Sequence, residues 1–409
     1  RLVSLGSPKR IMWFVLAGTA LIVVCIGGIY TRRRTMVAIG NLGGSEKVAR
    51  RVGLAMRWFL FGYPAIFIGF VIISLILGRD SVSLPITPWI TWGLSIPFWV
   101  SMLVMLQALP FLILLDLLSA GNRIIRKQTI PRRTRAIATL APLLCFLLYT
   151  PIRIAVEHAS LSVHTYSVGS GSESLRIVFV GDLQQDNMTG PSRANEFIGL
   201  VNKQAADLIL SGGDWINVGP DYIGAATTSA GKLQSRLGTF SAEGDHENFA
   251  YRDKDKSLRE VRSGLAANNV HLLHNEVRVF EQGGKRVAVL FLAYNYIYRT
   301  PPDEIRALIA QGVGADYTIL VTHQFDAHVA ALANDKVDLV LAGHTHGGQV
   351  NPVVGFWHVP LARIETKYVE GRYRLSPRTE VIVTAGIGFS LAPFRYASPA
   401  SIEVIDLHF

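Results

Sequence analysis

Long runs of hydrophobic residues dominate the first part of the chain and predict helices that span a membrane. Ile11–Tyr30 contains no charged residue and has about the 20 residues that a helix needs to cross a bilayer. Similar runs cover Trp58–Leu77, Trp89–Leu118 and Ala136–Val156. A cleaved signal peptide is the alternative for the first run, but no small-residue cleavage site follows it and further apolar runs do. We therefore expect about four transmembrane helices within residues 1–156.

Ionisable residues are rare inside these predicted spans. Asp116 and Arg153 each stand alone, close to the end of a span, so the sequence indicates no ionisable cluster within the membrane. We therefore interpret this region as a membrane anchor. An entry path for a lipid substrate is the alternative interpretation.

The pattern changes near Leu175 to short β-branched runs, which alternate with amphipathic segments and polar turns. The runs predict buried strands at Leu175–Val180, Asp207–Leu210, Val287–Ala293, Tyr317–Val321 and Val337–Leu341. Helices are predicted at Ser192–Gln204 and Ser257–Asn268. The chain is thus expected to have an N-terminal all-α transmembrane region, a linker over 157–174 and an α/β domain over 175–409.

The net charge of +10 adds an orientation to this picture. Most of the excess lies next to the predicted spans, in the segments 32–57 and 123–135, which together contain thirteen Lys and Arg residues against five on the other side of the spans. Basic loops favour the cytoplasmic face, so both segments are expected there, and nucleic acid is not an expected partner. An even number of spans then places the domain after residue 156 outside the cytoplasm, in a multi-pass plasma membrane protein.

Polar residues follow several of the predicted strands within two to four positions. These residues are Asp182, Asp214, His323 and His344. Strand ends of an α/β sheet meet in one crevice, so the four side chains are expected to converge. A single Asp in such a place is most often a turn former or a helix cap, but the series of four indicates a chemical site.

The most specific string is Gly343-His344-Thr345-His346-Gly347-Gly348-Gln349. Two histidines separated by one residue at a strand end can direct their imidazoles at neighbouring metal ions, and glycines permit a tight turn around them. Five other histidines have no such setting and are interpreted as surface or core residues, namely His271, His274, His328, His358 and His408.

With these motifs in place, the chain resembles the calcineurin-like metallophosphoesterase superfamily. The matching strings are Gly181-Asp182-Leu183-Gln184, Gly213-Asp214-Trp215-Ile216-Asn217, Gly244-Asp245-His246-Glu247, Thr322-His323 and Gly343-His344-Thr345-His346. The Gly347-Gly348-Gln349 extension and the segment from Gly386 to Arg395 are similar to its bacterial membrane-associated branch, which implies a bacterial inner membrane. The resemblance covers residues 175–409.

The resemblance implies two packed β-sheets flanked by helices, with two divalent metal ions at the strand ends. One ion would be held by Asp182, Gln184, Asp214 and His346. The other would be held by Asp214, Asp245, His323 and His344. A carboxylate suits the shared position of Asp214 because its oxygens can serve two cations, and a metal pair can stabilise both the attacking and the leaving oxygen of a phosphoryl transfer.

Two of these positions depart from the family pattern, which usually has His at 184 and Asn at 245. Gln184 offers a neutral oxygen in place of a nitrogen, whereas Asp245 adds a negative charge to the second set. Metal affinity is therefore expected to shift from the first set toward the second. Asp186 is a possible substitute ligand near Gln184.

The same resemblance gives roles to His246 and Asn217. His246 matches a histidine near the leaving oxygen, which acts as a general acid, while water activated by the metal ions attacks phosphorus. Asn217 matches a position that orients groups around the site.

The function expected from the sequence is hydrolysis of a phosphodiester, phosphomonoester or pyrophosphate bond at the outer face of the membrane. The substrate is a phosphate ester, with a lipid-linked one as an option. The metal is expected to be Mn²⁺, with Zn²⁺, iron and Mg²⁺ as alternatives. One rival is a cytoplasmic-face pyrophosphatase of the lipid-A precursor UDP-diacylglucosamine, against which the charge bias argues. Another is a lapsed domain that only binds a phosphate-bearing ligand.

Overall fold

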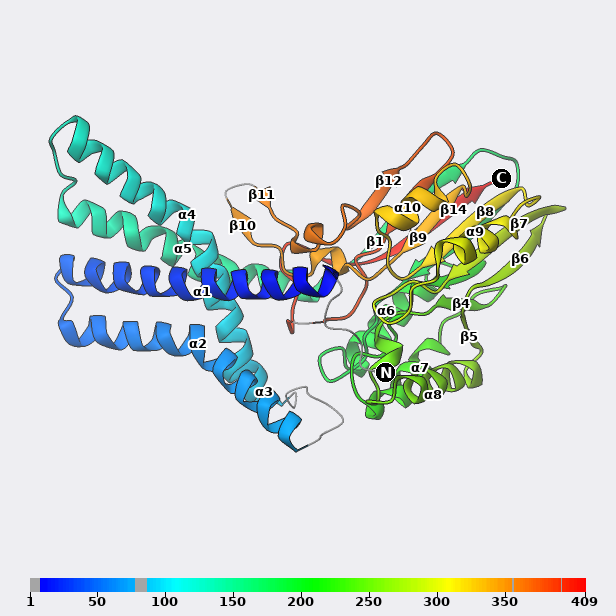
Figure 1. The fold of residues 1–409 in the computed structure, drawn as a ribbon, viewed down its shortest axis with the longest axis horizontal. Helices are drawn as coiled ribbons and strands as arrows, with labels where there is room; N and C mark the ends of the chain where they lie inside the picture. Colours follow the sequence, from blue (N-terminus) through cyan, green and yellow to red (C-terminus); the bar gives the residue numbers. More distant parts are fainter. Residues whose placement is uncertain (1–7, 78–86, 355–356, 391) are drawn as a thin grey trace. The chain divides into compact units, whose positions relative to one another are not determined.

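The computed structural model describes residues 8–77, 87–354, 357–390 and 392–409, with side chains from residue 22 onward except at positions 75, 88 and 354. The chain divides into two compact units (Figure 1). One unit contains residues 1–73, 84–153 and 352–357, and the other contains residues 74–83, 154–351 and 358–409.

The first unit is helical. Its helices are α1 (Pro8–Asn41), α2 (Glu46–Ile76), the short α3 (Pro88–Ile90), a π-helical turn η1 (Thr91–Ser95), α4 (Ile96–Ile125) and α5 (Arg132–Ala159), whose last turn belongs to the second unit. Three helical segments of the described chain are long and apolar enough to cross a membrane: 46–74, 91–125 and 132–159. These segments contain or overlap the last three predicted spans and indicate a membrane protein. The first predicted span, Ile11–Tyr30, lies within α1, and its side chains before residue 22 lie outside the described part.

The two ionisable residues that the sequence presents as isolated are both paired in the structure. Arg153 donates a hydrogen bond to Tyr149 Oη, while Asp116 contacts Tyr30 Oη at 2.6 Å, Arg34 Nη1 at 2.9 Å and Arg135 Nη2 at 2.6 Å. The partners of Asp116 come from α1 and α5, which explains why sequence distance conceals the cluster.

The second unit contains two six-stranded sheets. The first has the order β1 (Leu161–Gly169), β14 (Ala400–His408), β2 (Ser174–Val180), β3 (Leu208–Ser211), β4 (Thr239–Ala242) and β5 (Val270–Leu273). The second has the order β12 (Gly371–Arg374), β13 (Glu380–Val383), β9 (Leu339–Ala342), β8 (Tyr317–Thr322), β7 (Lys285–Leu292) and β6 (Glu276–Gln282). Short strands β10 (Val353–Val354) and β11 (Trp357–His358) pair with each other.

The five predicted strands correspond to β2, β3, β7, β8 and β9, which carry apolar side chains on both faces because both faces are covered. Phe179, Leu210, Phe291, Ile319 and Leu341 belong to one fully buried cluster between the sheets. A large side chain buried in this way contributes roughly 1.5–3 kcal/mol.

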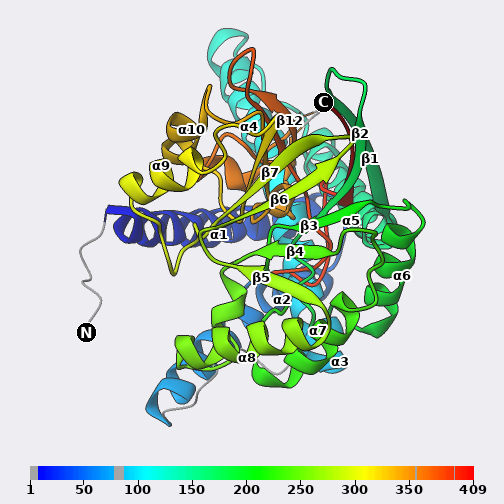
Figure 2. The same ribbon diagram turned by 90° about the vertical axis from the view of Figure 1, so that its right-hand side faces the viewer.

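Helices cover the outer faces of the two sheets. The first sheet packs against α6 (Pro191–Asn202), α7 (Ile223–Ala230) and α8 (Lys254–Ala267), and the second against α9 (Pro302–Ala310) and α10 (Ala327–Ala333). Figure 2 shows α6, α7 and α8 on one side of the sheets and α9 and α10 on the other. The expected architecture of two packed sheets flanked by helices is confirmed, and α6 and α8 match the two predicted helices.

The segment 157–174, expected to be a linker, instead contains strand β1. β1 pairs in parallel with β14 over nine residues, from Leu161 with Ala400 to Gly169 with His408. Most β1 side chains are only half-buried, because the strand lies at the edge of its sheet. Its mixed polar composition therefore lacks the apolar run by which the central strands are predicted.

Candidate metal centre

Left-handed backbone conformations mark the loops that follow β2, β3 and β9. Positive φ angles occur at the non-glycine residues Asp182 (52°), Gln184 (43°), Asp214 (59°), His344 (73°) and His346 (50°). Such conformations are unfavourable for side chains and cluster at functional sites. Main-chain hydrogen bonds hold two of them in place, from Asp182 N to Gly213 O (2.9 Å) and from Gln184 N to Asp214 O (2.8 Å).

Asp245, His323 and His344 form one cluster, whose potential ligand atoms lie within 4.8 Å of one another. Asp245 Oδ2 lies 3.1 Å from His344 Nδ1 and 3.3 Å from His323 Nε2. Together with Asp214, which the sequence analysis assigns to both metal ions, these residues are called the Asp245 site below.

Each histidine of the Asp245 site is held by a second partner. His323 Nδ1 lies 2.8 Å from Gly212 O, to which it donates, so its Nε2 is the nitrogen that faces Asp245. His344 Nε2 lies 3.4 Å from Glu365 Oε2, which leaves Nδ1 facing Asp245. An oxygen behind an imidazole fixes the position of its proton and the orientation of its ring, as is usual behind metal-binding histidines.

Asp182, Asp214 and His323 form a second cluster, also with potential ligand atoms within 4.8 Å. Asp214 Oδ2 lies 3.4 Å from His323 Nε2 and accepts a hydrogen bond from Gln184 Nε2 at 3.1 Å. His346 Nε2 lies 3.8 Å from Asp182 Oδ1. The set Asp182, Gln184, Asp214 and His346 is called the Asp182 site below. All seven predicted ligands therefore lie in one group of contacts, and Asp214 contacts both sides of it.

Two buried polar atoms of the Asp182 site have unused hydrogen-bonding capacity. Within the described part of the chain, neither Gln184 Oε1 nor His346 Nδ1 has a hydrogen-bond partner. Leaving a buried polar group without a partner costs about 1–3 kcal/mol. A cation coordinated by the carbonyl oxygen of Gln184 would remove this cost at that atom, so the residues present fit a metal ion.

Burial and close contacts shift the pKa values of several side chains in the site. Burial, assisted by Asp214, raises the pKa of Asp182 to about 6. Burial opposes ionisation of Asp245 as well, but hydrogen bonds from His323 and His344 lower its pKa well below the usual range. The pKa of His344 is lowered by burial but raised overall to about 9 by Asp245 and Glu365. The carboxylates and imidazoles of this buried group thus shift one another's pKa values strongly, as is common at functional sites.

His246 and Asn217 lie against this group. His246 Nδ1 lies 2.7 Å from Asn217 O, and His246 N donates to Asp214 Oδ1 at 2.8 Å. The ring is 15% exposed and its Nε2 lies 3.8 Å from Asp214 Oδ2. Donation from Nδ1 to the carbonyl of Asn217 leaves Nε2 as the nitrogen that faces the site.

Both carboxylate oxygens of Asp186, the suggested substitute ligand, already accept hydrogen bonds within the protein. Its Oδ1 accepts from Met188 N (2.6 Å) and Thr189 N (2.8 Å), and its Oδ2 accepts from Asn217 Nδ2 (2.6 Å). The side chain of Asn217 also donates to Phe389 O at 3.3 Å. Asp186 and Asn217 therefore connect the loop after β2 to the segment that follows β13.

Glu247 and Glu365 contact candidate ligands, and sequence reasoning assigned neither of them to the site. Glu247 accepts hydrogen bonds from Asp214 N (3.1 Å), Gly244 N (2.7 Å) and Trp215 N (2.7 Å), and burial together with Asp214 raises its pKa to about 8. Glu247 directly follows His246, and this position was the available signal. Glu365 lies in no motif, so no local pattern indicates its contact with His344.

The Gly347-Gly348-Gln349 string shapes the loop and does not enter either cluster. Gly347 (φ 61°) and Gly348 (φ 86°) have left-handed conformations, and a Cβ there would overlap Ser398 and Asn351 respectively. Gln349 Nε2 donates to Ala392 O at 2.7 Å. The string thus binds the histidine loop to the segment after β13.

Comparisons with known proteins agree with this geometry. Residues 175–348 match the family model described as calcineurin-like phosphoesterase. The chain is 27% identical over 239 residues to an uncharacterized metallophosphoesterase of Helicobacter pylori (strain ATCC 700392 / 26695), covering 58% of this chain and 60% of that protein. It is 28% identical over 259 residues to the transmembrane protein with metallophosphoesterase domain of Bos taurus, covering 61% and 56%.

A third relative is Phosphodiesterase YaeI of Escherichia coli (strain K12), which is 25% identical over 236 residues, covering 57% of this chain and 82% of that protein. The chain spans about 60% of the length of the Helicobacter relative. The family match begins at Leu175, the first buried residue of β2, and includes the histidine loop after β9. Residues 175–348 are therefore similar to the calcineurin-like phosphoesterase family.

Proposed function

We propose that the chain is a membrane-anchored metallophosphoesterase, which hydrolyses a phosphodiester, phosphomonoester or pyrophosphate bond. The observation that supports it best is the convergence of two Asp and three His side chains around Asp214, next to Gln184 Oε1, which has no partner among the described residues. The phosphodiester is the first bond to test, because one relative is named a phosphodiesterase.

The Asp182 site and the Asp245 site would each hold one divalent cation, with Asp214 shared between them. Such a pair lowers the pKa of water and offsets charge on the phosphoryl oxygens. Oxygen atoms dominate the Asp182 site, and that ligand type favours Mn²⁺ or Mg²⁺ over Zn²⁺. We therefore propose Mn²⁺ as the activating metal.

His246 would supply the proton to the leaving oxygen. Its Nδ1 is anchored by Asn217 O, so a proton carried on Nε2 faces the site. Asp214 holds the backbone of His246 from one side, at 2.8 Å. Asn217 is thus a positioning residue, because it fixes the orientation of the His246 ring before the proton is transferred.

The proposal is tested by metal analysis and turnover of a generic aryl phosphodiester in one preparation of the full chain. His323→Ala should lose metal and activity together, since His323 contacts both Asp214 and Asp245. His328→Ala is the matched control, because His328 is an exposed histidine at the start of α10. Bound metal without turnover of any phosphate ester would favour the ligand-binding alternative instead.

We further propose that the phosphoesterase domain lies outside the cytoplasm and acts on a phosphate ester at the membrane surface. The thirteen basic residues of segments 32–57 and 123–135 support this orientation. A reporter fused after Phe409 should be active only outside the cytoplasm. If the domain is protected from protease in intact spheroplasts and cleaved only after lysis, the proposed orientation is wrong. That result would favour the alternative of a cytoplasmic-face pyrophosphatase.

A further inference from the structure

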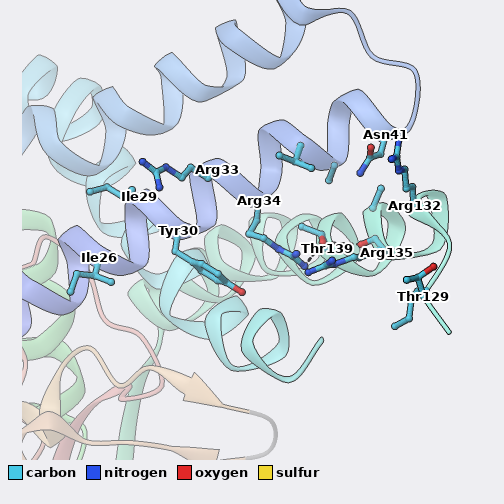
Figure 3. Close-up of a pocket in the computed structure, with 14 residues that line it drawn as sticks. Ile26, Ile29, Tyr30, Arg33, Arg34, Asn41, Thr129, Arg132, Arg135 and Thr139 are labelled. Carbon is cyan, nitrogen blue, oxygen red and sulfur yellow. Dashed lines mark hydrogen bonds between the residues drawn. The ribbon is translucent and has the colours of Figure 1, made fainter. Parts of the chain in front are cut away.

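The helical unit contains a pocket of about 910 Å³ formed by α1, the start of α5 and the loop before α5 (Figure 3). Its lining extends along α1 from Ile26 to Asn41 and along the other segment from Thr129 to Thr139. This pocket lies wholly within the helical unit and shares no residue with the Asp182 or Asp245 site.

The lining is strongly cationic. Four of its 14 residues are arginines, namely Arg33, Arg34, Arg132 and Arg135, and no lining residue among the described ones carries a carboxylate. Figure 3 shows the side chains of Arg34 and Arg135 converging beside Thr139, to which Arg34 Nη2 donates at 3.1 Å. Guanidinium groups gathered in this way fit the oxygens of a phosphate.

A single acidic residue outside the lining, Asp116 of α4, fixes two of these arginines. Its Oδ1 lies 2.9 Å from Arg34 Nη1 and 2.6 Å from Arg135 Nη2. One carboxylate cannot neutralise two guanidinium groups, so positive charge remains after this pairing. Arg33 and Arg132 are exposed, and none of the ion pairs within the described chain includes either of them.

The other side of the pocket is apolar and open to the surroundings. Ile26 is 64% exposed and Ile29 is 47% exposed. These side chains lie on α1 in the same stretch as Arg33 and Arg34, where the first predicted span ends. A cationic end next to exposed aliphatic side chains at the end of a span matches a ligand with a charged head and a hydrocarbon tail.

We propose that this pocket binds the phosphate headgroup of an anionic membrane lipid, with the lipid chain against Ile26 and Ile29. Arg34 and Arg135, held by Asp116, form the fixed part of the headgroup site. Arg33 and Arg132 supply the remaining positive charge. This binding site is separate from the proposed phosphoesterase chemistry, and its test does not depend on turnover.

The test measures lipid binding to the full chain in a neutral detergent, using phosphatidylglycerol as the anionic probe and phosphatidylcholine as the zwitterionic one. The variant Arg33→Gln/Arg132→Gln removes two charges without touching the Asp116 ion pairs. Arg50→Gln/Arg51→Gln is the matched control, because these two arginines are exposed on α2 and lie outside the pocket. Arg33→Gln alone repeats the test should the double variant unfold.

We expect phosphatidylglycerol to bind at least about tenfold more weakly to the pocket variant, equivalent to about 1.4 kcal/mol, and unchanged to the control. Phosphatidylcholine binding should not distinguish the three proteins. Inorganic phosphate should fail to displace the lipid, because it lacks the chain. Unchanged lipid binding in the pocket variant, an equal loss in the control, or displacement of the lipid by equimolar inorganic phosphate would each overturn the proposal.

Discussion

The Asp245 site and the Asp182 site share Asp214 but differ in how completely their side chains are already held. In the Asp245 site, Asp245 contacts His344 at 3.1 Å and His323 at 3.3 Å, and an oxygen behind each imidazole fixes its ring. In the Asp182 site, the separation of His346 and Asp182 is 3.8 Å, and Gln184 Oε1 has no partner among the described residues.

Two metal sites of equal affinity are therefore not expected here. A preorganised site with an additional carboxylate binds a cation more tightly than a site whose ligands must still be ordered. Asp245 carries a charge where the related pattern has a neutral amide, and Gln184 is neutral where that pattern has an imidazole. Both departures act in the same direction, toward a tight Asp245 site and a weaker Asp182 site.

The largest effect should follow from Asp214→Asn, because this change weakens metal binding at both sites at once. Each metal ion supplies several kcal/mol of stabilisation of the transition state, so the rate should fall on the order of 10⁴-fold. Bound metal should decrease at both sites in the same protein, measured by elemental analysis. Loss of a single ion would mean that Asp214 serves only one site.

His246→Ala should separate chemistry from metal binding. Removal of a positioned general acid typically lowers the rate by about 10² to 10⁴, while neither site loses a ligand. Turnover should be compared for aryl phosphodiesters with poor and good leaving groups, since a good leaving group needs little protonation. Activity equal to wild type with the poor leaving group would exclude His246 as the acid.

Glu365→Gln should weaken the Asp245 site selectively. Glu365 contacts His344 Nε2 at 3.4 Å, and loss of such a partner typically costs about 10- to 100-fold in metal affinity or activity. Titration with Mn²⁺ should therefore show weaker binding at the tighter of the two sites. Glu281→Gln, on the edge strand β6, is the control. Equal affinity in the two variants would show that Glu365 does not hold His344.

The sequence predicts those parts of the fold and of the site that a local pattern of residues is enough to identify. Strands such as Val287–Ala293 are buried on both faces, so their apolar runs are visible, and Asp182 and His344 are indicated by their place after a strand. Strand β1 is not visible in this way, because its partner β14 lies more than 200 residues away and its exposed edge tolerates polar residues.

Long-range contacts account for the rest. Glu365 reaches His344 from a segment without a motif, and Asp116 meets Arg34 and Arg135 from different helices. No periodicity encodes such meetings, since they depend on how complete elements pack. That Gln184 Oε1 has no hydrogen-bond partner in the described part of the chain is also a property of the folded loop, although the departure at position 184 is visible in the sequence.

The smallest effect is expected from Gln184→His, which should make the metal affinities of the two sites more similar. A histidine tolerates the left-handed conformation of this residue (φ 43°) better than most side chains, and its nitrogen is a stronger ligand than an amide oxygen for Mn²⁺ or Zn²⁺. Metal binding at the Asp182 site should tighten by about tenfold, or about 1.4 kcal/mol, while turnover is retained.

Gln185→His is the matched control, because Gln185 is the buried neighbour whose Oε1 also lacks a partner in the described chain. Metal titration of apo protein, followed by activity and occupancy together, gives the answer. If Gln184→His binds no more tightly than Gln185→His, then Gln184 is not a ligand, and the weakness of the Asp182 site must come from His346, which no hydrogen bond holds at Nδ1 within the described residues.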